Sequence, residues 1–147
     1  MGKCCPSLIT LSMNPNEFYL DIDFWNDHCL IVWPVDKEKA EKWYREKFPN
    51  REPETFNELE DADAVSYCGD ARIIFLKEWE MSVEKISNLA HECVHIANHI
   101  LVDKGVREKK GDDEALAYFV GYLMRHLLAA VKQIEEDLTG DVRSVGV

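Results

Sequence analysis

Apolar and polar residues alternate along the first half of the chain in a pattern that predicts two β-hairpins. Every second residue is apolar in 18–24, and the run 30–35 is apolar almost throughout. An Asn-Asp pair lies between these segments, as a hairpin turn requires. The segments 64–68 and 71–77 repeat this arrangement around a Gly-Asp pair. We therefore expect a short, largely antiparallel sheet made of two hairpins.

Helical spacing replaces this alternation in the segments between and after the hairpins. Asp36 is expected to cap a helix that ends at Phe48, and the polar loop 49–61 follows it. A longer periodic segment begins at the predicted N-cap Ser82 and ends at Lys104, which a glycine follows. The sequence thus predicts one short and at least one long helix packed on the sheet.

A second long helix is predicted over Ala115–Asp137, with Asp112 or Asp113 as its cap. Its apolar stripe consists of Leu116, Phe119, Val120, Leu123, Met124, Leu127 and Val131. A different face carries Glu114, Tyr118, Gly121 and Arg125. Gly121 costs a helix about 1 kcal/mol relative to alanine, so we expect it to mark a close approach to another helix.

The first long helix carries an HExxH run from His91 to His95. Four-residue spacing puts two imidazoles on one helix face, one turn apart, where they can hold a zinc ion with Glu92 beside it as a base. Apolar residues gather on one side of this helix, and Asn88 and His99 join the two histidines on the other. The alternative is a solvated helix with chance histidines, but such a helix would carry lysine and glutamate on its outer face.

Glu114 follows His95 after eighteen intervening residues and is the candidate third ligand. A site with two histidines needs one more donor, and a carboxylate at the start of the next helix can provide it. The alternative is that Glu114 is an acid favoured by the helix dipole in a first turn.

The spacing HExxH-x18-E resembles the zinc site of the gluzincin metallopeptidases, whose third ligand is a glutamate on a following helix. The stretches His91–His99 and Glu114–Phe119 are similar to the HExxHxxxH and EAxxFA-type helices of small ImmA/IrrE-like proteins and of short phage-encoded metallopeptidase-like proteins. The resemblance implies a minimal zincin-like fold and one Zn²⁺ per chain, held by His91, His95 and Glu114. It also implies that the strand 72–76, which leads into the histidine helix, lies along the substrate cleft.

In such a site Glu92 is the general base and acid, which takes a proton from the activated water and passes it to the leaving amine. The tetrahedral intermediate needs a hydrogen-bond donor, and Tyr118 and Arg125 are the candidates. Tyr118 can equally be a supporting hydrogen-bond donor or a core tyrosine, and Arg125 a surface cation. His99 is expected to lie on the substrate side or to support a ligand.

Composition limits the other function classes. The net charge is −11 without a basic stripe, so we expect no nucleic-acid partner. There is no apolar run of membrane-span length and no secretory leader pattern, so a membrane association is not expected either. Five cysteines without a CxxC pair indicate a reducing, cytoplasmic compartment rather than disulfides or a cysteine-based metal site. Cys93 falls on the apolar side of its helix and is expected in the core.

The sequence therefore predicts a single α+β domain over residues 1–147, with flexible ends at 1–16 and 139–147. The predicted function is zinc-dependent hydrolysis of peptide bonds in a restricted protein or peptide substrate. The alternative is a metal-binding regulatory or interaction protein that keeps the site and has little turnover. The oligomeric state is not predicted.

Overall fold

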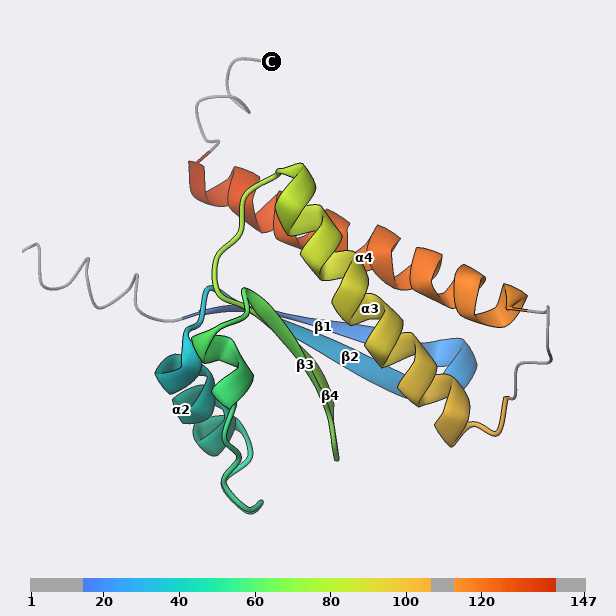
Figure 1. Cartoon of the computed structure of the whole chain (residues 1–147), viewed down its shortest axis with the longest axis horizontal. Helices are drawn as coiled ribbons and strands as arrows, with labels where there is room; N and C mark the ends of the chain where they lie inside the picture. Colours follow the sequence, from blue (N-terminus) through green and yellow to red (C-terminus); the bar gives the residue numbers. More distant parts are fainter. Residues whose placement is uncertain (1–14, 107–112, 140–147) are drawn as a thin grey trace, which may run out of the picture.

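A computed structural model describes residues 15–106 and 113–139 (Figure 1). The elements in chain order are β1 (Asn16–Ile22), the 3₁₀ turn η1 (Asp23–Trp25), β2 (Asp27–Trp33), α2 (Lys37–Lys47), the 3₁₀ turn η2 (Asn57–Glu60), β3 (Ala64–Cys68), β4 (Arg72–Leu76), α3 (Val83–Asp103) and α4 (Glu114–Thr139). The predicted α+β class, the two hairpins and the helices are thus confirmed.

The two hairpins join into one four-stranded sheet with the order β1-β2-β4-β3. Each hairpin is antiparallel, but the central strands β2 and β4 pair in parallel, with Ile31 opposite Ile74. The sheet is therefore mixed, and the largely antiparallel sheet expected from the sequence is correct only within each hairpin. This order places β4 in the centre and leaves β3 at one edge.

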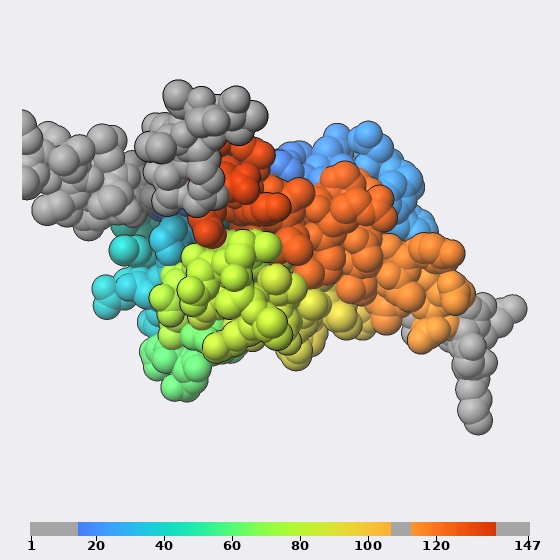
Figure 2. Space-filling model, turned by 90° about the horizontal axis from the view of Figure 1, so that it is seen from above, coloured from blue at the N-terminus to red at the C-terminus, as the bar shows by residue number. Residues whose placement is uncertain are grey.

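Alternate residues of the central strands face two separate cores. In β4, Ile74 and Leu76 pack in the core beneath α3 and α4, whereas Ile73 and Phe75 pack in the core beneath α2. The sheet is thus covered by α3 and α4 on one face and by α2 on the other (Figure 1). In Figure 2, α3 and α4 lie next to each other, with α4 beside the end of the β1–β2 hairpin. Phe24 and Phe119 meet at that end with ring centroids 5.8 Å apart.

Side-chain caps determine where the helices begin. The Asp36 carboxylate accepts a hydrogen bond from the Lys39 amide at 2.9 Å, and the Ser82 hydroxyl accepts one from the Lys85 amide at 3.2 Å. These bonds satisfy backbone donors that have no partner inside the helix. Gly105 follows α3 with a φ of +76°, a conformation that a glycine adopts without strain. The predicted caps Asp36 and Ser82 are therefore confirmed.

Three local predictions are wrong. Phe24 continues the alternation of β1 in the sequence, but the chain has already turned into η1 and the side chain is 58% exposed. The loop 49–61 is not simply polar, because Phe56 and Leu59 are buried in the core beneath α2. Gly121 does not mark a close helix approach, since a Cβ built there meets no atom within 4 Å.

Most of the predicted flexible ends, 1–16 and 139–147, lie outside the described residues, as does the possible cap Asp112. Asn16 and Thr139 are described and belong to β1 and α4. Within the part of the chain that the structure describes, no helix is both long enough and apolar enough to cross a bilayer.

Candidate metal centre

The two histidines of the HExxH run converge on the exposed face of α3. The Nε2 atoms of His91 and His95 are 3.1 Å apart. A zinc ion at the usual distance of about 2.05 Å from both atoms would make an N–Zn–N angle of about 98°, which is near the tetrahedral angle. The spacing of the two nitrogen atoms therefore allows both to bind one zinc ion, and without a metal one ring can donate a hydrogen bond to the other.

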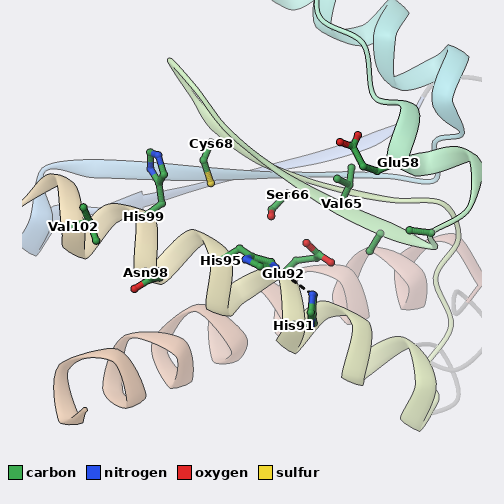
Figure 3. A pocket seen from close by; sticks show the side chains of 12 residues that line it. Glu58, Val65, Ser66, Cys68, His91, Glu92, His95, Asn98, His99 and Val102 are labelled. Carbon is green, nitrogen blue, oxygen red and sulfur yellow. Dashed lines mark hydrogen bonds between the residues drawn. The ribbon is translucent and has the colours of Figure 1, made fainter. Parts of the chain in front are cut away.

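Glu92 is the buried acid of this site. Its side chain lies on the same groove as the histidine pair, yet the residue is only 7% exposed. Figure 3 shows the two rings and the Glu92 carboxylate close together on the side of α3 that faces β3. Glu92 thus presents a carboxylate to the same groove as the two histidines.

A groove of about 640 Å³ runs between α3 and the edge strand β3 (Figure 3). Its lining residues are Glu58, Ala62, Ala64, Val65, Ser66, Cys68, His91, Glu92, His95, Asn98, His99 and Val102. The helix presents its histidines to this groove because its apolar stripe, which includes Leu89, Cys93 and Ile96, is buried against the sheet and α4. A second hollow of about 380 Å³, which Asn88 and Asp63 help to line, also borders His91 and Glu92.

Glu114 is not brought to the histidine pair. It begins α4, which starts near the end of α3 and runs back along it (Figure 1). The end of α3 at Asp103 is eight residues beyond His95, or about 12 Å along the helix axis. Among residues 15–106 and 113–139 there is no group of three or more His, Cys, Asp or Glu that could hold a metal ion. Glu114 lies in the first helical turn, as the helix-dipole alternative expects.

The two candidate donors also lie away from the groove. Tyr118 is 78% exposed and Arg125 is exposed, and neither lines the groove. Because α4 packs through Phe119 and Leu123, the face that carries Glu114, Tyr118 and Arg125 is turned to solvent. The structure therefore separates these three residues from His91, Glu92 and His95.

His99 is the third histidine of the groove. Its Nδ1 lies 3.8 Å from the Asp103 carboxylate and has no hydrogen-bond partner among the described residues. Asp103 in turn pairs with the buried Arg72, which begins β4. This chain of contacts ties the end of α3 to the sheet, and the His99 side chain lines the groove beside it.

The strand beside the groove is β3 and not β4. The sequence predicted that the strand 72–76 lies along the cleft, but β4 has a neighbour on each side, and β3 pairs only with β4 within the described sheet. The Lys77 backbone N–H donates to the Asp63 carbonyl oxygen, and the Gly69 N–H donates to that of Ala71. Along β3, the odd-numbered residues are thus the ones whose backbone groups bond to β4. The N–H and C=O groups of the intervening residues Ala64, Ser66 and Cys68 therefore point to the open edge.

Two groove residues, Cys68 and Glu58, were not singled out by the sequence. Cys68 closes the end of the groove next to His99, and burial raises the pKa of its thiol. The alternation of small residues at 64, 66 and 68 is the one signal that could have indicated a strand against a groove. Cys93 is fully buried, and burial raises its pKa to about 12, so it is a core residue and not a nucleophile.

Comparison with protein families, with curated proteins and with solved structures gives no match. The fold and the site define an α+β domain that presents a histidine pair and a buried glutamate beside a strand edge with which no other described strand pairs.

Proposed function

We propose that this protein is a zinc-dependent hydrolase that cleaves peptide bonds in a restricted protein or peptide substrate. The observation that carries the proposal is the convergence of the His91 and His95 Nε2 atoms, 3.1 Å apart, beside the buried Glu92. Two imidazoles and a nearby glutamate are two of the three protein ligands and the base that hydrolysis by a metal-activated water requires.

Each residue of the site has a distinct role in this proposal. Zinc, when bound, supplies a Lewis acid and lowers the pKa of a coordinated water toward neutrality. Glu92 accepts a proton from the attacking water and delivers it to the leaving amine, and its burial strengthens its interaction with both. The open edge of β3 aligns an extended substrate through main-chain hydrogen bonds with Ala64, Ser66 and Cys68.

The third ligand is the part of the proposal that rests on the resemblance alone. The resemblance assigns it to Glu114, which begins α4 and does not line the groove. Zinc content of a Glu114→Gln variant is therefore the measurement that separates a three-residue site from one in which solvent or substrate completes the coordination.

A second function has a specific observation in its favour. Neither Tyr118 nor Arg125 lines the groove, so the site lacks the two donors expected to stabilise a tetrahedral intermediate. The protein would then be a metal-binding regulatory or interaction protein that holds zinc and an extended partner segment but turns over little.

Metal content by elemental mass spectrometry tests the site first. We expect about one zinc per chain in the parent protein, loss of zinc in His95→Ala, and retention in the control His99→Ala, which changes a groove histidine outside the pair. No zinc in the parent protein, even after zinc is offered at neutral pH, would contradict both functions.

Turnover then separates the two functions. On a quenched-fluorescence peptide library, the hydrolase should lose activity in Glu92→Gln while it keeps its zinc. If the zinc-loaded parent protein cleaves no peptide of the library, the regulatory function is supported instead.

A further inference from the structure

The wall of the groove opposite α3 carries one acidic residue, Glu58, on η2. Figure 3 shows Glu58 near Val65 on one side of β3, with His91 and Glu92 on the other side. Glu58 is exposed and lines the groove. Within residues 15–106 and 113–139, no lysine or arginine pairs with its carboxylate, and none lines the groove. This wall of the groove therefore carries a carboxylate that no lysine or arginine of the described residues pairs with.

The segment around Glu58 makes this part of the molecule strongly acidic. Residues 52–71 contain seven aspartates and glutamates and no lysine or arginine. The whole chain carries a net charge of −11. A ligand that reaches this wall meets a negative potential, and a cationic side chain complements it.

The dimensions of the groove fit a short extended segment. Along α3 the groove extends from His91 to Val102, a rise of about 16 Å over eleven residues. Five residues of an extended strand cover about 16 Å, and β3 itself is five residues long. The N–H and C=O groups of Ala64, Ser66 and Cys68, which point away from β4, are spaced to pair with such a segment.

The geometry of a strand then determines which side chain meets Glu58. Successive side chains of a strand point to opposite faces. In a segment paired with β3, one side chain points to α3 and the histidine pair, and the next points to η2 and Glu58.

We propose that Glu58 selects extended polypeptide segments that carry a lysine or arginine directly next to the residue facing the His91–His95 pair. The substrate class is therefore a basic, extended segment. The proposal deepens the proposed function, on which it rests for cleavage, but strand pairing and the charge contact with Glu58 do not require the metal.

Selection from a random heptapeptide library displayed on phage tests the proposal. The bait is the zinc-loaded Glu92→Gln protein, which binds segments without cleaving them. We expect lysine and arginine to be enriched about three- to fivefold over the same selection on a protein that also carries Glu58→Gln, the range expected for one solvent-exposed ion pair. The matched control adds Glu60→Gln in place of Glu58→Gln; this removes the same charge from η2 at a position that does not line the groove.

Three results would overturn the proposal: no enrichment on the parent bait, equal enrichment with and without Glu58, or an equal loss in the Glu60→Gln control. An equal loss would mean that the net charge alone attracts basic peptides. The Glu58→Lys variant adds an independent check, because it should favour aspartate and glutamate instead.

The selection also separates this proposal from the proposed function. If the enrichment depends on Glu58 and persists in a His95→Ala protein, and the parent protein binds no zinc, the binding groove is supported and the hydrolase proposal is refuted. If the protein binds zinc but the enrichment is the same with and without Glu58, the metal site is supported and the proposed role of Glu58 is refuted.

Discussion

A buried cluster of charges at the end of α3 is the interaction whose loss should destabilise the fold most clearly. Arg72 is 9% exposed, and its guanidinium pairs with Asp103 and, at 3.6 Å, with Asp27. The Asp27 side chain is 8% exposed, whereas that of Asp103 is 49% exposed. Lys104 is the other cation near Asp27, at 3.8 Å. The cluster thus joins the starts of β2 and β4 to the end of the helix that carries the histidines.

The burial of Asp27 determines the expected magnitude. Replacing Arg72 with methionine keeps most of the side-chain volume but leaves the buried Asp27 carboxylate with the His28 amide and ring and with Lys104 as the one remaining lysine or arginine partner among the described residues. Removing one partner of a buried ion pair costs about 3–5 kcal/mol, and because Lys104 remains we expect about 3 kcal/mol for Arg72→Met. The control Lys47→Met breaks a pair with Glu17 whose side chains are 42% and 39% exposed, so it should cost at most about 1 kcal/mol.

Urea unfolding followed by tryptophan fluorescence measures both changes in the free energy of unfolding. The double variant Arg72→Met, Asp27→Asn should recover part of the loss, because it also removes the stranded charge. A loss below about 1 kcal/mol for Arg72→Met, no larger than that of the control, would refute the reasoning that this cluster holds α3 on the sheet.

Three further predictions follow from single residues. Gly121→Ala should raise the free energy of unfolding by about 0.4–1 kcal/mol, because the added Cβ meets no atom, and a lower urea midpoint would contradict this. Ser66→Pro should keep the fold and the zinc content but abolish peptide selection, since it removes an N–H from the open edge; unchanged selection would exclude strand pairing with β3. Burial acts to raise the pKa of Glu17, but hydrogen bonds from Lys47 and Trp43 lower it overall below its usual value. The stability from Glu17 is therefore present at neutral pH and lost as the pH falls through the lowered pKa. Glu17→Gln should thus be destabilising, by less than about 1 kcal/mol, at pH 7 and near neutral at a pH below the lowered pKa. Urea midpoints that differ equally at both pH values would contradict this.

Local signals predicted the helices and hairpins well because these depend on neighbouring residues. Asp36 and Ser82 cap α2 and α3 by hydrogen bonds that reach only three residues along the chain. The histidine face of α3 was equally predictable, since four-residue spacing and an apolar stripe act within one helix. The sequence alone therefore determined the elements and placed His91, Glu92 and His95 together.

Tertiary structure decided which elements meet around that face. A strand that is apolar on both faces, such as β4, can be buried at any central position of a sheet. Its residue pattern therefore did not reveal that β4 pairs in parallel with β2, or that β3 lies at the edge. Whether Glu114 approaches the histidines depends on the rotation and direction of α4, which the packing of Phe119 and Leu123 sets and the spacing after HExxH does not. Glu58 and Cys68 enter the groove through long-range contacts and not through any periodic signal. The sequence by itself thus determined which side chains share the histidine face of α3. Long-range packing determined which strand and which other side chains surround that face.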